Sequence, residues 1–532
     1  MDNRTIIAIV LIILLWSGYS IFFTPSSSNN ISQENIEPSE LIINKDKTVN
    51  NNEILSSSIN SETLSFSDEE LIEIKNNKFD VILSTRGAAL KSINLFDFKE
   101  DNESDSSNFF LLNNEDYKNY SLQTFFTDGL AIPKDLSFSL KNNVQPDFNS
   151  SNNSVSVIFE TEYNGFLLSK SYKFFKDSYH VEVLSSIENN NNEHFSGIYN
   201  ISLNTSWSTD TKSDLYSFVG PVTFDGSKLQ EDKPKNVVKN PVIYQDFVWS
   251  GFTDKYFMQA INPGENIDQV FIRYHSDMIE NRFSSNSFIL LPGKSESFKH
   301  IVYLGPKELE ALSVSDSSFD EAIHFGFFHF LAKPLFDVLR FFNSFINNYG
   351  FSIILLTVCI KLIFWPLTQK SYKSMQGMQK LQPEMKRLKE KYSDDKQRLN
   401  QEMMSFYRDN KVNPLGGCLP ILIQIPVFFS LYKVLLDSIE LRHAPFILWI
   451  SDLSAKDPYY ITPIIMGASM FLQQKLTPTN LDPTQEKVML MMPIIFTFLF
   501  LNFPAGLVIY WLVNNLLTIL QQLLIRRQAQ KA

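Results

Sequence analysis

The hydrophobic residues of this chain follow two patterns, and each pattern occupies its own regions. Long, nearly uninterrupted apolar runs lie at residues 5–23, 350–368, 418–436, 459–475, 488–503 and 506–525. A helix needs about 20 apolar residues to cross a hydrocarbon core of about 30 Å. The runs predict a polytopic α-helical membrane protein with six spans in total, five of them in a core at residues 349–532. We expect residues 1–23 to be an uncleaved signal anchor rather than a cleaved signal peptide, because no A-x-A-like cleavage site follows.

The region between the first two runs has a different pattern. Residues 24–65 are rich in Ser and Asn and have little periodicity, which is typical of a flexible linker. Residues 66–318 contain short alternating stretches such as FDVILST, SVSVIFETEY and SYHVEVLSSIE, separated by Gly, Asn and Asp clusters. Alternation with a period of two indicates half-buried strands. We therefore expect a large antiparallel β-sandwich domain, and we find no catalytic constellation in it.

A third kind of segment precedes the second span. The stretch FDEAIHFGFFHFLAKPLFDVLRFFNSFI, residues 319–346, has aromatic and aliphatic residues on most of one side and a thin polar face. We expect an amphipathic helix within residues 319–348 that lies in the outer membrane interface and is broken or kinked at Pro334. A core helix of the sandwich is the alternative. His324 and His329 are flanked by aromatic residues, which favours an interfacial role over metal ligation.

Residues 369–416 are predicted to form a helical hairpin. Apolar residues recur at spacings of three and four on both sides of the turn YSDDKQ, as expected for two helices with one apolar stripe each. The segment holds 11 Lys and Arg residues against 6 Asp and Glu residues. One interpretation is a hairpin whose stripes pack on each other. The other is a docking arm for ribosomal RNA or anionic lipid, and the two are compatible.

The charge distribution predicts the orientation of the chain. Residues 24–319 carry a net charge of −18 and the remaining residues +7, within a total of −11. Basic segments beside spans remain in the cytoplasm. We therefore place the hairpin and both termini in the cytoplasm of a bacterium, with the β domain in the periplasm.

The second span contains one charged residue, Lys361, in ILLTVCIKLIFWP. A charge in a span costs about 2.5–3.5 kcal/mol on insertion scales, so the lysine either snorkels to the interface or faces a water-filled cavity. Polar residues in other spans favour a shared groove. The candidate groove residues are Lys361, Thr357, Gln424, Ser430, Gln473, Gln474, Asn514, Asn515 and Thr518.

Three long stretches resemble the YidC/Oxa family of membrane insertases: NPLGGCLPILIQIPVFFSLYKVL, ELRHAPFILWISDLSAKDPYYITPIIMGASMF and MPIIFTFLFLNFPAGLVIYWLVNNLLTILQQ. The resemblance implies a protein that inserts and folds inner-membrane proteins, alone or with the Sec translocon, without ATP or metal. It also implies a polar groove with one cation, in many members an arginine. Lys361 keeps the charge at this position but lacks the bidentate fork of arginine.

The resemblance implies further residue roles and partners. Tyr510 and Trp511 are expected to contact the sliding substrate segment. Tyr372 and Asp482 are candidate ribosome contacts, with simple solvent exposure as the alternative for both. The expected partners are nascent membrane proteins, the ribosome, Sec translocon components and membrane lipids, with no specific DNA. We expect no cofactor and no enzyme activity. The alternative function is a secondary transporter or channel with an intramembrane lysine, although no internal repeat of spans is evident.

Overall fold

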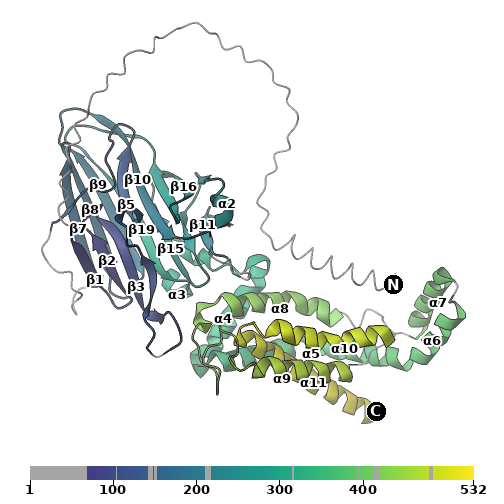
Figure 1. Ribbon diagram of the computed structural model, residues 1–532. Helices are drawn as coiled ribbons and strands as arrows, with labels where there is room; N and C mark the ends of the chain where they lie inside the picture. The colour runs from purple at the N-terminus through teal and green to yellow at the C-terminus, as the bar shows by residue number, and fades with distance from the viewer. Residues whose placement is uncertain are drawn as a thin grey trace, which may run out of the picture. The chain divides into compact units, whose positions relative to one another are not determined.

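The computed structural model describes residues 69–531 except for 104, 142–147, 149–152, 210–216, 314–316, 394, 411–418 and 478–482. The predicted anchor at 1–23 and the linker at 24–65 lie outside the described residues. The described chain begins with strands and ends with helices, as the two hydrophobic patterns predict (Figure 1).

The strands form three sheets. The first has the order β1-β2-β3-β4, with β1 Leu71–Lys75, β2 Phe79–Ser84, β3 Ala89–Lys99 and β4 Asn108–Asn113. The second has the order β13-β16-β17-β10-β18, and β5 also pairs with β10. Its strands are β5 Gln123–Thr127, β10 Phe195–Ser206, β13 Val242–Tyr244, β16 Ile267–His275, β17 Met278–Ser285 and β18 Phe288–Leu290.

The third sheet is the largest, with the order β12-β11-β14-β15-β19-β9-β8-β7-β6. Its strands are β6 Ser139–Leu140, β7 Ser154–Tyr163, β8 Phe166–Phe175, β9 His180–Asn189, β11 Gly220–Phe224, β12 Leu229–Glu231, β14 Trp249–Thr253, β15 Phe257–Asn262 and β19 Ser295–Pro306. Short helical turns accompany the strands: η1 Tyr117–Asn119, α2 Pro234–Val237 and α3 Leu309–Leu312.

Every strand pair in the described residues is antiparallel, which confirms the predicted antiparallel β character. The sheets share one buried core. In β8, buried and partly buried residues alternate along the whole strand, so one face is buried as the period-two pattern requires. Aromatic residues join the layers. Phe79 of β2 lies 6.2 Å from Phe174 of β8, and Tyr199 of β10 stacks on Phe298 of β19 at 4.0 Å.

The predicted amphipathic helix is shorter than the sequence indicates. Two 3-10 turns, η2 Phe319–Ala322 and η3 Gly326–Phe328, precede α4 His329–Ile346. Gly326 has a φ of +71°, outside the helical region, so the helix begins only after it. Pro334 lies inside α4, and the helix continues through it. One side of α4 is buried at Ala332, Phe336 and Leu339, and the other is exposed at Phe330, Phe341 and Phe345.

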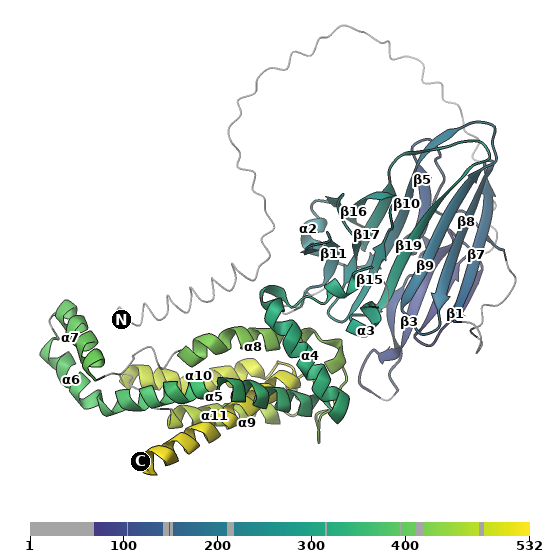
Figure 2. The ribbon, with the colours of Figure 1, turned by 180° about the vertical axis from the view of Figure 1, so that it is seen from behind.

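The last third of the chain is helical, and its long helices run side by side in both views (Figures 1 and 2). These helices are α5 Tyr349–Lys380, α8 Leu419–Asp437, α9 Ile461–Leu476, α10 Pro483–Phe500 and α11 Ala505–Lys531. A 3-10 turn, η5 Ile439–Leu441, follows α8. By length and composition, α5 and α11 qualify as membrane spans among the described residues, and Val488–Phe500 is a shorter apolar helix. The count of six spans stays a prediction.

The segment between α5 and α8 contains two further helices, α6 Gln382–Lys391 and α7 Lys396–Asp409. They pack against each other. The helix α5 continues through residues 369–380, so the first part of the predicted hairpin extends the span instead of starting a separate helix.

Candidate functional site

Lys361 lies within α5 and points toward the other helices. Its side chain is 5% exposed, whereas the following residues Leu362 and Ile363 are 61% and 71% exposed. Successive residues of a helix point about 100° apart, so the apolar residues occupy the outer surface and the lysine the inner one. A lysine that snorkels along a lipid-facing surface would be exposed. The arrangement therefore favours an inward-facing cation.

The ammonium group of Lys361 has no hydrogen-bond or ion-pair partner within the part of the chain that the structure describes. A buried charge of this kind requires water or a ligand, because desolvation without compensation is costly. Chemically, the site offers one positive charge to an anionic group.

Two other predicted groove residues lie on the buried sides of α5 and α8. Thr357, one turn before Lys361, donates a hydrogen bond to the Ile353 carbonyl at 2.6 Å. Ser430 of α8 donates to the Pro426 carbonyl at 2.7 Å. Both hydroxyl groups are thus satisfied by their own helices, so they add polarity to the interior without an unpaired donor.

The polar residues of α9 and α11 partly bond to each other. The Asn515 amide of α11 donates to Ser469 Oγ of α9 at 3.1 Å, and both residues are buried. Thr518 donates to the Asn514 carbonyl of its own helix at 2.7 Å. Gln473 and Gln474 are half-buried near the end of α9. Of these bonds, the one between Asn515 and Ser469 joins α11 to α9.

The predicted groove residues lie on helices that contact each other: α5 packs against α8 and α11, and α9 packs against α11. Gln424 of α8 is half-buried. No hydrogen bond among the described residues joins Lys361 to another predicted groove residue. The structure therefore brings the polar residues into one helical assembly, while a single continuous groove stays a prediction.

Tyr510 and Trp511, the predicted substrate contacts, lie in an aromatic cluster. Trp511 packs on Phe428 of α8 at 4.9 Å and on Phe500 of α10 at 5.2 Å. Tyr510 is buried and lies 6.4 Å from Phe428. The cluster joins α8, α10 and α11, so a substrate reaches Tyr510 only if these helices separate. Their role as substrate contacts stays a prediction.

The structure does not support the predicted ribosome contact at Tyr372. Its side chain is 2% exposed, and its hydroxyl group lies 3.0 Å from Arg526 Nε. The prediction assumed that the chain leaves the bundle soon after residue 368, but α5 continues and keeps Tyr372 against α11. Asp482 lies outside the described residues.

Sequence reasoning missed three residues of α11: Gln521, Gln522 and Arg526. Gln521 donates to the Trp365 carbonyl at 3.3 Å, and Gln522 donates to Thr477 Oγ1 at 3.0 Å. Both glutamines are buried. The signal was present in the sequence, because Thr518, Gln522 and Arg526 are spaced four apart and so lie on one side of an apolar helix.

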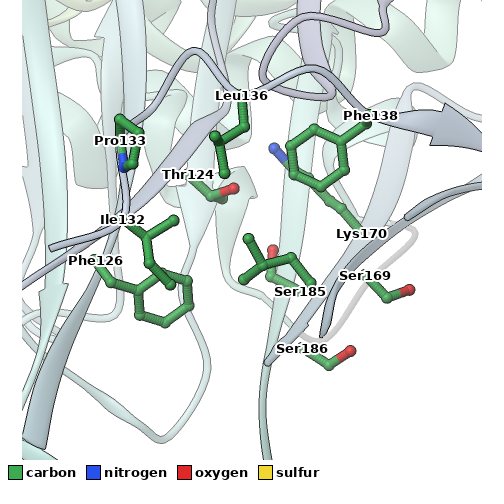
Figure 3. Close-up of a pocket in the computed structure, with 11 residues that line it drawn as sticks. Thr124, Phe126, Ile132, Pro133, Leu136, Phe138, Ser169, Lys170, Ser185 and Ser186 are labelled. Atoms are coloured by element: carbon green, nitrogen blue, oxygen red, sulfur yellow. The ribbon is translucent and has the colours of Figure 1, made fainter. Parts of the chain in front are cut away.

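A small cavity lies in the β domain (Figure 3). Its volume is about 10 Å³, enough for one water molecule. Lys170 of β8 lines it, and its ammonium donates to the Leu122 carbonyl. Burial lowers the pKa of Lys170 well below its usual value.

In the described residues no group of three or more His, Cys, Asp or Glu residues is arranged to hold a metal ion.

Comparison with known proteins adds independent evidence. The family model described as 60Kd inner membrane protein matches residues 341–532, and the model described as YidC periplasmic domain matches residues 71–338. The chain is 40% identical to the membrane protein insertase YidC of Geotalea uraniireducens over 99% of both chains. It is 44% identical to that of Citrifermentans bemidjiense over 86% of this chain and 85% of the relative.

One solved structure, titled as an active YidC insertase with the first transmembrane domain resolved, also matches. It covers 85% of this chain and 92% of its own, with 18% sequence identity and a TM-score of 0.36.

Proposed function

The chain belongs to the YidC family of membrane protein insertases, and from this premise we propose how its residues carry out insertion. Substrates enter from the cytoplasmic side of the inner membrane, through a polar groove between α5, α8, α9, α10 and α11. The protein acts alone or together with the Sec translocon. It uses no cofactor and catalyses no covalent reaction.

The observation that supports this mechanism is Lys361, whose side chain is 5% exposed and whose ammonium has no hydrogen-bond or ion-pair partner among the described residues. A nascent membrane protein brings a short hydrophilic tail, often acidic, into the groove. The tail is attracted to Lys361, and water around the lysine shortens the distance that polar groups cross in lipid. The charge lies about 10 Å from the predicted cytoplasmic end of its span, at 1.5 Å per residue.

Hydrophobic transfer drives the second step. The apolar segment of the substrate moves along the outer faces of α8 and α10 into lipid, gaining about 25 cal/mol per Å² of apolar surface removed from water. The membrane potential assists a negatively charged tail by about 2.3 kcal/mol per charge per 100 mV.

The proposed topology places the hairpin and both termini in the cytoplasm. Six spans with a cytoplasmic N-terminus give this arrangement, and the basic residues of 369–416 support it. The ribosome then delivers substrates near α6 and α7, and anionic lipid headgroups contact the same basic surface.

The test uses purified protein in sealed liposomes with a small single-span substrate that has an acidic outer tail. Insertion is scored as protease-protected product for the native protein, Lys361→Ala and Lys361→Arg. We expect alanine to reduce insertion by roughly tenfold, because a charge-assisted contact is lost, and arginine to preserve it. Lys370→Ala is the matched control, since Lys370 is an exposed lysine on the same helix.

The outcomes separate the parts of the proposal. Equal insertion by Lys361→Ala and the native protein would show that the charge is not a receptor for the tail. If the native protein itself inserts nothing, autonomous insertion is wrong, and a Sec-dependent assistant or a transporter becomes the better explanation.

A further inference from the structure

A single side chain, that of Arg526, bonds to two other helices of the core. Arg526 of α11 donates from Nε to the Tyr372 hydroxyl of α5 at 3.0 Å and from Nη2 to the Leu476 carbonyl of α9. The Tyr372 hydroxyl also lies 3.4 Å from that carbonyl. We call Arg526, Tyr372 and the Leu476 carbonyl the Arg526 clasp.

The clasp has a clear chemical basis. Leu476 is the last residue of α9, so its carbonyl has no partner within the helix. A cation near the C-terminal end of a helix is favourable because the helix dipole is negative there. Arginine presents several donors in a rigid plane, so it can serve the carbonyl and the tyrosine together. Because Tyr372 is buried, water competes little for these bonds.

Two neighbouring hydrogen bonds also hold α11 against α5 and α9. Gln522, one turn before Arg526, donates to Thr477 at the end of α9. Gln521 donates to the backbone carbonyl of Trp365 in α5. Three side chains from the last turns of α11 therefore bond to the end of α9 and to the second half of α5.

The Arg526 clasp contacts α5 after a proline that weakens the helix. Pro366 lies inside α5, where a proline removes one backbone hydrogen bond and favours a kink. Tyr372 follows this weak point, and α6 begins ten residues later at Gln382. We call residues 372–382 the stem of α5. At 1.5 Å per residue the stem is about 15 Å long. A small change of its direction would therefore displace α6 and α7.

We propose that Arg526 is a positioning residue for insertion, which fixes the stem of α5 through Tyr372 and Leu476 and so sets where α6 and α7 stand at the groove entrance. This inference depends on the proposed function, in which substrates arrive near α6 and α7. Arg526 does not contact substrate. Its effect passes through the direction of the stem.

A distance measurement tests the positioning directly. In full-length protein in liposomes, Cys359 and Cys418 are replaced by serine, and spin labels are attached at Met404→Cys and Ile464→Cys, two exposed residues of α7 and α9. Electron–electron double resonance gives the distribution of label distances. We expect Arg526→Gln and Tyr372→Phe to broaden or shift this distribution. Arg527→Gln, which removes the same charge from the exposed next residue, should leave it unchanged.

The insertion assay supplies the functional readout. We expect Arg526→Gln to slow insertion by roughly three- to tenfold, since a hydrogen bond to a charged group is lost. Arg526→Lys should be intermediate, because an ammonium keeps the charge but lacks the planar fork. The double variant Arg526→Gln/Tyr372→Phe should be no slower than the slower single variant, since both residues act through one contact.

Tyr372→Phe preserves the buried ring, so a loss of folding is not expected to obscure its result. A distance distribution in Arg526→Gln and Tyr372→Phe that matches the native one would overturn the proposal. So would an equal slowing by Arg527→Gln. Failure of the native protein to insert would instead contradict the proposed autonomous function, while the distance measurement would still test the clasp.

Discussion

At the residue scale, the interior of the β domain contains histidines that must stay neutral. His300 of β19 lies 2.9 Å from the Tyr199 hydroxyl through Nε2 and 2.9 Å from the Pro263 carbonyl through Nδ1. The carbonyl only accepts, so the ring proton is on Nδ1. Burial lowers the pKa of His300 to about 4, and it does the same to His180 of β9.

These histidines predict acid sensitivity of the fold. An unfolded histidine has a pKa of about 6.5, so the stability contributed by the neutral ring is fully present above pH 6.5 and is lost as the pH falls toward 4. We expect His300 alone to remove about 2 kcal/mol of unfolding free energy between pH 7 and pH 5. Urea unfolding of the full chain in detergent, followed by tryptophan fluorescence, measures this change.

The variant His300→Asn retains a donor for the Pro263 carbonyl and removes the titration. It should be less stable than the native protein at pH 7 but lose less stability on going to pH 5. The exposed His194→Asn is the control and should follow the native curve. An equal loss in His300→Asn and the native protein would assign the acid sensitivity to other groups.

The sequence predicts single residues well where an exceptional residue type marks them. A lysine inside an apolar run is visible at once, and the structure gives it an inward-facing place. The burial of Tyr372 could not be predicted, because the local sequence does not show that α11 packs on this side of the continuing helix. The role of Arg526 could not be predicted, since its partners lie on two other helices.

At the element scale, α9 and α10 approach closely at a glycine. A Cβ atom at Gly467 would lie 1.9 Å from Thr497 Oγ1. The Thr497 hydroxyl is itself held by the Pro493 carbonyl at 2.7 Å. The small residue therefore permits the close packing of these helices, as small residues do in membrane helix pairs.

Enlarging Gly467 should separate the two helices. We expect Gly467→Leu to destabilise the helical core by about 1–3 kcal/mol, because overpacking forces side chains and backbone to shift. The temperature at which the detergent-solubilised protein aggregates should fall by several degrees. Ala468→Leu, at the exposed next position, adds a larger side chain without this clash and should be tolerated. Equal tolerance of both variants would contradict the close approach of α9 and α10.

The elements predicted best are those in which hydrophobic residues follow a regular pattern over many residues. The alternating stretches form strands, and the long apolar runs within the described residues form helices. Helix ends were predicted less well. The helix α4 begins at His329, not near residue 319, because Gly326 and two 3-10 turns interrupt the apolar pattern. The helix α5 passes the expected end of its span, because residues 369–380 contain no proline and are rich in Lys, Gln and Met, which favour helix.

At the scale of the whole molecule, charge asymmetry is the main guide to orientation. The region outside the spans at 24–319 is strongly acidic, while 369–416 is basic. Membrane insertion retains basic segments in the cytoplasm. The chain order of β domain and helices followed directly from the hydrophobic patterns. The packing of the helices around Lys361 could not be predicted from these patterns, because contacts between distant segments produce no periodicity in the sequence.

The proposed orientation can be measured in a cysteine-free background. We expect an impermeant maleimide to label Ser227→Cys of the β domain in intact spheroplasts. Met404→Cys and Arg527→Cys should react only after permeabilisation, since both lie on the proposed cytoplasmic side. All three positions are exposed, so burial does not explain a lack of labelling. Labelling of residue 404 or 527 from outside would contradict the orientation.

The place of β19 in the largest sheet has a consequence for how the protein is made. It lies between β15 and β9, although β9 ends at Asn189 and β19 begins only at Ser295. Until β19 has been synthesised and exported, the sheet exists as two halves, and β9 and β15 each present an unpaired edge. Such edges are templates for aggregation. The periplasmic domain can therefore close only after nearly all of its chain has been exported, and any factor that shields these strand edges must act before β19 arrives.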